Sequence, residues 1–264
     1  MDWKTNVELK KDNTIMLHNT ESSSCGAKLS SKQMEVNQYF RGDRFISENS
    51  FESLLDEMER KELVRINSET TCGFNMNLDG TYQDNTKCSL EVHREKMVEL
   101  NKLRNNIPDV TKDTVMQKII TPTQLSEYIR EKSPRTDISG CASKAKDAAP
   151  YTNNISQAYE TLRLDYEGTV YKEIVEKNGD MNVMRFTSDY CPQNSEYPKM
   201  DGSEPWNKPP CTGTGFTGSR EHLVPEYNYG RGREISDGAI YKVDIDGNET
   251  MVAFWNHGRF EEIK

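Results

Sequence analysis

Apolar residues recur with helical spacing in the first half of the chain. Over 51–63 they fall at i, i+3, i+4 and i+7, which predicts a helix that begins after a serine N-cap. The charged stretch 89–133 is predicted to be mostly helical, with a short helix near 111–120. The last helix of this stretch begins at Thr121, where Gln124 three positions later predicts a capping box.

Alternating apolar and polar residues predict strands in the second half. Two hairpins are expected, one over 169–186 around an Asn-Gly turn and one over 239–255 around an Asp-Gly turn. Between them, a loop rich in Gly, Pro, Ser and Asn over 188–218 exceeds the usual length of a connector, which is typical of a functional loop. Ahead of the hairpins, 135–154 predicts a short strand and an Ala-rich helical turn, and 155–164 predicts another short helix.

The order of these elements indicates the fold class and the domain organisation. Helices first and strands afterwards favour an α+β fold over a parallel β-α-β arrangement. We expect a polar leader over 1–35 and a single domain over 36–264. Aromatic residues around Gly42 predict a strand, interrupted by that glycine, over 36–47 at the start of the domain.

Composition and charge narrow the class of protein. Hydrophobic residues make up 34% of the 264 positions, and no apolar run approaches the ~20 residues of a membrane-spanning helix. The net charge of −9 argues against a nonspecific nucleic-acid binder, although it allows a local basic pocket for a phosphate. The opening residues, MDWKTNVELKKDNT, contain no apolar core of the secretory type. The chain is therefore expected to be cytosolic, to leave by a route that reads no such signal, or to be an excised fragment.

Six cysteines leave two interpretations open. Cys72 with Cys88, and Cys191 with Cys211, have spacings at which disulfides would stabilise surface loops in an oxidising compartment. Reduced thiols are the alternative. The sequence contains no CxxC pair and no two histidines at helical spacing, so no metal site is expected.

Three short segments carry candidate chemistry. YFRGDR places Arg41 after two aromatic residues, DISG ends a predicted strand at Ser139, and EHLVP places Glu221 at the exit of the long loop. Their order resembles the arginine–serine–glutamate class of mono-ADP-ribosyltransferase toxins, the cholera- and pertussis-toxin-like enzymes. The sequence departs from that pattern in three ways: the middle motif has one hydroxyl rather than three, Ser219 stands two positions before the glutamate, and the motifs are far apart for a compact toxin domain. The resemblance therefore implies that the helical stretch over about 89–133 is an insertion in the single catalytic domain.

The resemblance implies a fold, a substrate and a set of roles. The fold would be a helical N-terminal half with a small bent β-sandwich of ADP-ribosyltransferase type, and NAD would be the substrate. Arg41, beside Gly42, would bind the NAD phosphates through its guanidinium fork. Glu221 would stabilise positive charge on the ribose as the nicotinamide bond breaks, and Ser139 would hold the glutamate or the ribose.

The same resemblance implies where the protein acts and on what. It would be a toxin-like effector, secreted or translocated into a target cell. It would transfer ADP-ribose to a protein acceptor of a host or a competitor, and a delivery or chaperone protein is a further expected partner.

Two alternatives stay open. Ile138-Ser139-Gly140-Cys141 is similar to the Leu-Ser-Gly-Cys of cytotoxic necrotising factor-like glutamine deamidases, in which a thiolate attacks a glutamine amide. His222 or His257 would then replace the histidine that this family places shortly after its cysteine. The other alternative is a non-enzymatic binding module whose cysteines are structural.

Overall fold

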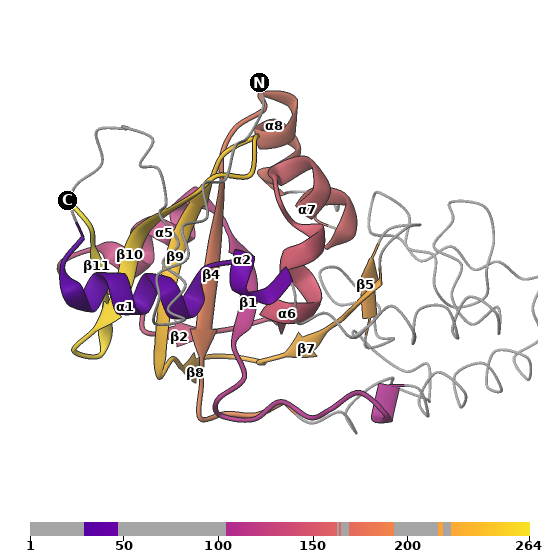
Figure 1. Ribbon diagram of the computed structural model, residues 1–264, viewed down its shortest axis with the longest axis horizontal. Helices are drawn as coiled ribbons and strands as arrows, with labels where there is room; N and C mark the ends of the chain where they lie inside the picture. The colour runs from indigo at the N-terminus through magenta and orange to yellow at the C-terminus, as the bar shows by residue number, and fades with distance from the viewer. Residues whose placement is uncertain (1–28, 47–103, 163, 165–168, 193–215, 219–222) are drawn as a thin grey trace, which may run out of the picture.

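The computed structural model describes residues 29–46, 104–162, 164, 169–192, 216–218 and 223–264 (Figure 1). The main sheet consists of β1 (Met116–Ile120), β3 (Cys141–Lys144), β4 (Met181–Thr187), β7 (Tyr227–Asn228), β9 (Asp237–Val243), β10 (Glu249–Asn256) and β11 (Arg259–Glu262). Its seven strands lie in the order β11-β10-β9-β4-β1-β3-β7. Every pairing between these neighbours is antiparallel.

Short ribbons and helices complete the described part. β2 (Asp137–Ile138) pairs with β8 (Arg233–Glu234), and β5 (Phe216–Gly218) pairs with β6 (Leu223–Pro225). The helices are α1 (Ser31–Phe40), α2 (Asp43–Ile46), α5 (Pro122–Ile129), α6 (Ala145–Ala148), α7 (Ile155–Thr161) and α8 (Tyr171–Glu176), with a 3-10 turn at Ala149–Tyr151. The fold is therefore a mixed one, in which a mostly antiparallel sheet carries several helices.

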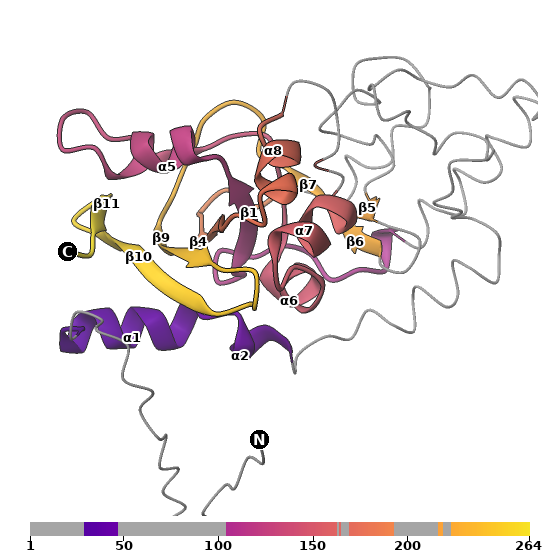
Figure 2. The same cartoon turned by 90° about the horizontal axis from the view of Figure 1, so that it is seen from above.

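Helices cover both faces of the main sheet. Figure 2 shows α1 along one face and α5 on the opposite face, with α6, α7 and α8 grouped beside β1. On the α1 face, Phe40 belongs to a cluster that includes Val183 of β4. On the α5 face, Tyr128 belongs to a second cluster with Met184 of β4. Because successive side chains of a strand point to opposite faces, β4 contributes to both clusters and is buried along its whole length.

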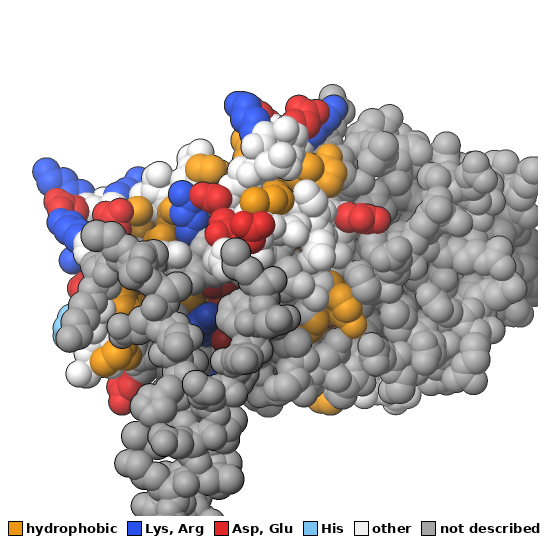
Figure 3. Space-filling model, turned by 45° about the horizontal axis from the view of Figure 1, so that its top comes forward, with side chains coloured by type: hydrophobic (Ala, Val, Ile, Leu, Met, Phe, Trp, Pro, Cys, Tyr) orange, Lys and Arg blue, Asp and Glu red, His pale blue; other side chains and the backbone are white. Residues whose placement is uncertain are grey.

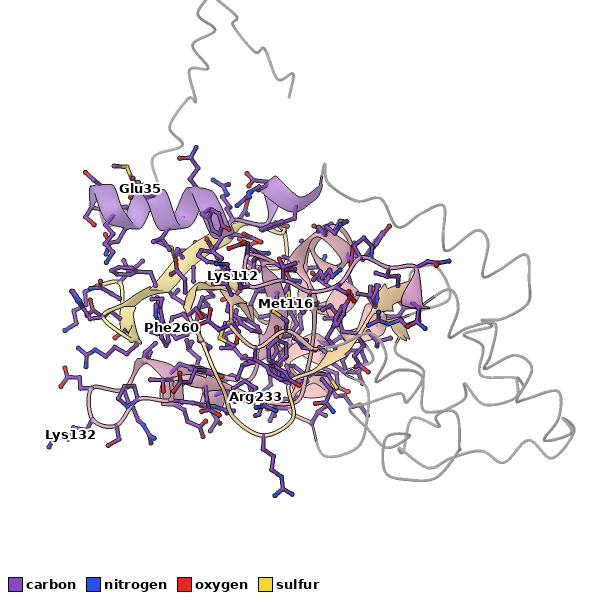
Figure 4. All side chains as sticks on the ribbon, turned by 90° about the horizontal axis from the view of Figure 1, so that it is seen from below. Glu35, Lys112, Met116, Lys132, Arg233 and Phe260 are labelled. Carbon is purple, nitrogen blue, oxygen red and sulfur yellow. The ribbon has the colours of Figure 1, made fainter. Side chains whose placement is uncertain are left out.

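The outer surface is charged and mixed in sign. Figure 4 shows Met116 and Phe260 inside the fold and Glu35 and Lys132 at its periphery. Acidic and basic side chains are interspersed over the described part of the face in Figure 3. One such exposed pair joins Lys177 Nζ to Glu173 Oε1 at 2.5 Å.

Several predicted elements are confirmed. At α5, Gln124 N donates to Thr121 Oγ1 at 3.1 Å and Thr121 N donates to Gln124 Oε1 at 2.9 Å, which is the predicted capping box. The Asp-Gly hairpin is β9 and β10, with Gly247 at a φ of 86° in the turn. The strand predicted to end at Ser139 is β2, the Ala-rich helical turn is α6, and the helix expected over 155–164 is α7. The strand β3 forms between β2 and α6, where the sequence predicts no second strand.

Three predicted elements are wrong. The segment 36–47 is not a strand, because a capping box at Ser30 starts α1 and α2 follows it, so the predicted leader boundary at residue 35 falls inside α1. The segment 111–120 contains β1 rather than a short helix, because 116–120 fills the space between β4 and β3. The first arm of the Asn-Gly hairpin is α8, and only its second arm, β4, is a strand. The helix predicted over 51–63 lies outside the described residues.

A buried ion pair attaches the N-terminal helices to the sheet. Arg185 of β4, whose side chain is 2% exposed, donates from Nη2 to Glu249 Oε1 at 2.6 Å and from Nη1 to Glu249 Oε2 at 2.8 Å. The same Nη1 donates to the carbonyl oxygen of Phe40 at 3.1 Å, and Gly42 N donates to Glu249 Oε2 at 2.9 Å. A Cβ on Gly42 would lie 2.4 Å from Glu249 Oε1, so only glycine fits between α1 and α2.

Glu249→Gln should lower the free energy of unfolding by about 3–5 kcal/mol, because it leaves the buried Arg185 guanidinium without a counter-charge. Urea denaturation measures this change. The matched control is Lys177→Gln, which breaks an exposed ion pair and should leave the urea midpoint unchanged. Equal midpoints for the wild type and Glu249→Gln would show that the pair does not anchor the helices.

The same pair should make stability depend on acid pH. Burial alone would raise the pKa of Glu249, but the hydrogen bonds and charge of Arg185 outweigh it and hold that pKa below its ordinary value. The stabilisation is therefore complete above about pH 4.5 and is lost as the pH falls through the folded-state pKa. Thermal denaturation between pH 7 and pH 3 should show a shallower acid limb for Glu249→Gln than for the wild type.

Candidate functional site

An opening between two central strands forms the candidate site. β1 pairs with β3 through Met116 and Gln117, whereas Cys141 and Ala142 of β3 pair with β7. The rest of β1 continues along β4. A cavity of about 260 Å³ lies where the two strands part.

Polar groups from several elements line this cavity. β1, β3, α5, the region of α7 and α8, and the β5–β6 ribbon all contribute to the wall. The polar and thiol side chains of the lining belong to Gln117, Lys118, Thr121, Gln124, Cys141, Ser143, Thr169, Tyr171, Thr217 and Glu226. The apolar part of the wall comes mainly from Ile119, Leu162, Leu164 and Val170. With ten polar or thiol side chains among its fifteen lining residues, this small cavity suits a polar ligand.

Lys118 supplies a positive charge at the opening. Its Nζ donates to the carbonyl oxygen of Cys141 at 2.7 Å, which joins the middle of β1 to the start of β3. Gly140, at a φ of 72°, brings the backbone close to this ammonium, since a Cβ there would lie 3.5 Å from Nζ. An ammonium can bind an anionic group of a ligand as a point charge.

Buried oxygen atoms line the inner wall. Thr217 is 4% exposed, and its Oγ1 has no hydrogen-bond partner among the residues that the structure describes. Glu226, which directly follows β6, is also 4% exposed. A buried hydroxyl without a partner costs about 1–3 kcal/mol, so a cavity with such a group suits a ligand or water that completes the bond.

Hydrogen bonds to neighbouring elements fix the side chain of Gln117 in the cavity wall. Gln117 accepts a hydrogen bond from Arg185 Nε at 2.8 Å through its Oε1. Its Nε2 donates to Thr152 Oγ1 at 2.8 Å, and that hydroxyl donates to the carbonyl oxygen of Ala148 at 3.0 Å. Gln117 is therefore fixed in orientation by the network that also holds Glu249.

The described members of the predicted site lie in two different surroundings: Arg41 and Gly42 at the end of α1, and Ser139 between β2 and β3. Arg41 caps the end of α1, and its half-exposed side chain pairs with Asp43 at 3.3 Å. Gly42 beside it is buried against Glu249. Ser139 lies between β2 and β3, where its Oγ accepts from Arg135 Nη2 at 2.6 Å. Within the described part of the chain, Arg41, Gly42 and Ser139 are not part of the cavity lining.

Glu221 lies outside the described residues, in the segment 219–222. That segment connects β5 to β6, whose antiparallel ribbon borders the cavity through Thr217. The catalytic role predicted for Glu221 therefore stays a prediction, and the chain on either side of it belongs to the cavity region.

Most of the lining residues are not among the candidates that the sequence offers, and Ser143, Lys118 and Glu226 show why. Ser143 could have been found from the sequence. It stands near the end of a strand that runs directly into the Ala-rich α6, and this setting matches the expected strand–serine–helix motif better than the setting of Ser139 does. No local pattern in the sequence indicates Lys118 or Glu226, because only the pairing of β1 and the position of β6 bring them to one cavity.

Of the residues that the deamidase alternative requires, the structure places the cysteine in the cavity wall and His257 outside it. Cys141 is half-buried and lines the cavity. His257 lies exposed in the turn between β10 and β11, at a φ of 49°, and is not part of the lining; His222 lies outside the described residues. Cys191 Sγ lies 3.8 Å from the carbonyl oxygen of Asp189, and its predicted partner Cys211 lies outside the described residues, so that disulfide stays a prediction.

Neither a metal centre nor a membrane span is found in the described ranges. They hold no group of three or more His, Cys, Asp or Glu side chains that could bind a metal ion. No helix among them is both long enough and apolar enough to cross a membrane. Comparison of the chain with protein-family models, with curated proteins and with solved structures found no match.

Thr217→Val should leave stability unchanged or raise the melting temperature, because it removes a buried hydroxyl that has no partner in the described structure. Thr152→Val is the matched control and should cost about 1–3 kcal/mol, since it leaves Gln117 Nε2 unsatisfied. Differential scanning calorimetry of the two variants measures both effects. A loss of stability in Thr217→Val as large as in Thr152→Val would mean that Thr217 is a structural residue.

Proposed function

We propose that the cavity between β1 and β3 binds the nicotinamide–ribose half of NAD and that the protein transfers ADP-ribose to a protein acceptor. The observation that carries the proposal is the meeting of Lys118, Ser143 and Thr217 in one cavity, bordered by the ribbon whose connection contains Glu221. A volume of about 260 Å³ suits half of a dinucleotide, with the remainder outside. The resemblance to the toxin-like transferases supplies the reaction.

The cavity changes the roles expected of individual residues. Lys118, rather than Arg41, is the cation placed to bind an NAD phosphate, because Arg41 lies on the α1 side and pairs with Asp43. Ser143, rather than Ser139, is the hydroxyl placed to contact the ribose. Glu221 keeps its proposed role of stabilising the positive charge that develops on the ribose as nicotinamide leaves.

The proposal also includes the type of fold and the place where the protein acts. The opening between β1 and β3 would be the NAD cleft of a bent β-sandwich of ADP-ribosyltransferase type. The protein would act as a secreted or translocated effector on a host or competitor protein, with a delivery or chaperone partner. The mixed surface charge in Figure 3 does not oppose NAD binding, since one local cation is enough for a phosphate contact.

Glu221→Gln should lower nicotinamide release from NAD by about 10²–10³-fold, as expected when one charge-stabilising group is lost. Lys118→Gln should weaken NAD binding by roughly tenfold, the scale of one lost charge-assisted contact. Arg41→Gln is the matched control, because it removes an arginine outside the cavity and should leave both quantities unchanged.

The measurements are nicotinamide release and isothermal titration with NAD, together with labelling of a cell lysate by NAD that carries a tagged adenine. A labelled protein band establishes transfer to an acceptor. No nicotinamide release by the wild type, with and without lysate, would refute the proposed reaction. If NAD binding weakens in Arg41→Gln and persists in Lys118→Gln, the NAD site is on the α1 side and not in the cavity.

A glutamine deamidase is the second candidate, and the position of Cys141 in the cavity lining favours it. Cys141→Ser separates the two functions, because a transferase should keep its nicotinamide release whereas a deamidase should lose all activity. Target proteins from the lysate, compared by mass, distinguish the outcomes further: deamidation replaces an amide by an acid, whereas transfer adds ADP-ribose.

A further inference from the structure

A second cavity of about 260 Å³ lies on the other side of the β3–α6 junction. Arg44 and Phe45 of α2, the segment that leads into β1, and Lys144 and Lys146 form its wall. Ser143 lines the first cavity and Lys144 lines the second, because successive side chains of β3 point in opposite directions. The second cavity is therefore separate from the proposed NAD site.

Lys144 is a buried amine with neutral partners. Its side chain is 2% exposed, and its Nζ donates to the carbonyl oxygen of Pro108 and, at 3.5 Å, to that of Asp109. The ring of Tyr227 lies on its other side, with the centroid 5.4 Å from Nζ. Among the described residues, no carboxylate forms an ion pair with this amine. A buried ammonium without a counter-charge is costly, so burial favours the neutral, nucleophilic form of Lys144.

Charged groups of both signs surround Lys144. Burial is the main cause that lowers the pKa of Lys144 to about 8; Asp147 and Asp109 oppose that shift, and Lys146 and Arg104 reinforce it. Asp147 is itself 3% exposed, and burial raises its pKa, which weakens its negative charge as a partner. An amine that is desolvated beside other cations is the type that enzymes use to form Schiff bases.

We propose that Lys144 is a carbonyl-reactive amine and that the cavity beside it admits a small aldehyde, which it binds as an imine. The amine nitrogen attacks the carbonyl carbon, and the resulting carbinolamine loses water. The carbonyl oxygen leaves in that water with both protons of the amine, so the step needs no oxidant, reductant or further reactant.

The wall of the cavity indicates an uncharged ligand. Arg44 and Lys146 contribute two positive side chains, and Asp109 and Asp113 contribute two negative ones. Apart from Lys144 itself, the charged side chains of the wall balance, so they add no net attraction for an anionic aldehyde. Phe45 lends an apolar surface beside the amine, which suits a short aliphatic chain.

Reductive alkylation of the native protein with acetaldehyde and sodium cyanoborohydride tests the proposal. The hydride reduces the imine to a stable secondary amine, and peptide mass spectrometry then gives the rate at each lysine. At pH 7 the neutral fraction is roughly 300-fold larger for a pKa of about 8 than for the ordinary value of 10.5. We therefore expect Lys144 to react at least about tenfold faster than the exposed Lys112.

The pH profile and the unfolded chain provide the controls. In the native protein the rate at Lys144 should level off above about pH 8, whereas in the unfolded chain, where the ordinary lysine pKa applies, it should keep rising towards pH 10. In urea the rates at Lys144 and Lys112 should become equal, since the cavity is gone. A rate at Lys144 no greater than that at Lys112 in the native protein, or a preference for Lys144 that persists in urea, overturns the proposal. No variant and no NAD are needed, so neither misfolding nor failure of the proposed transferase function can explain the outcome.

Discussion

The guanidinium of Arg185 is the constraint on which the arrangement of the described elements depends. It lies in the most buried strand of the sheet and bonds at once to Gln117 of β1, to Glu249 of β10 and to the last carbonyl of α1. Charge-assisted, bidentate contacts of this kind specify geometry strictly, because a displaced partner leaves a buried charge uncompensated. This one side chain therefore fixes the positions of β1, β10 and the N-terminal helices relative to one another.

The same network reaches the proposed NAD cavity. From Glu249 it runs through Arg185 to Gln117, whose side chain is part of the cavity wall. The docking of α1 and the shape of the cavity floor are therefore set by one group of hydrogen bonds. In this arrangement the segment around Arg41 and Gly42 has a structural explanation, since its glycine is needed for contact with Glu249.

Local signals in the sequence predicted some of this structure, and long-range pairing decided the rest. The capping box at Thr121 and the Asp-Gly hairpin were predictable because each depends on residues close together in the chain. The sequence predicts a helix where β1 forms, because only the neighbouring strands β3 and β4 make 116–120 extended. The ion pair between Arg185 and Glu249 joins residues 64 positions apart, and no spacing rule indicates such a contact. The candidate site followed the same pattern: Ser143 could have been found from its place before α6, whereas Lys118 and Glu226 could not.

The shortness of β3 has a consequence for how this chain tolerates insertions. Its four residues supply Ser143 to one cavity and Lys144 to another, on opposite sides of the strand. A single residue added to or removed from the turn at Gly140 would shift the register by one and exchange the two directions. The hydroxyl and the amine would then change places, and a lysine would enter the cavity that holds Lys118 while the other cavity lost its amine. The length of that turn is therefore as strictly limited as the identity of any residue in either cavity.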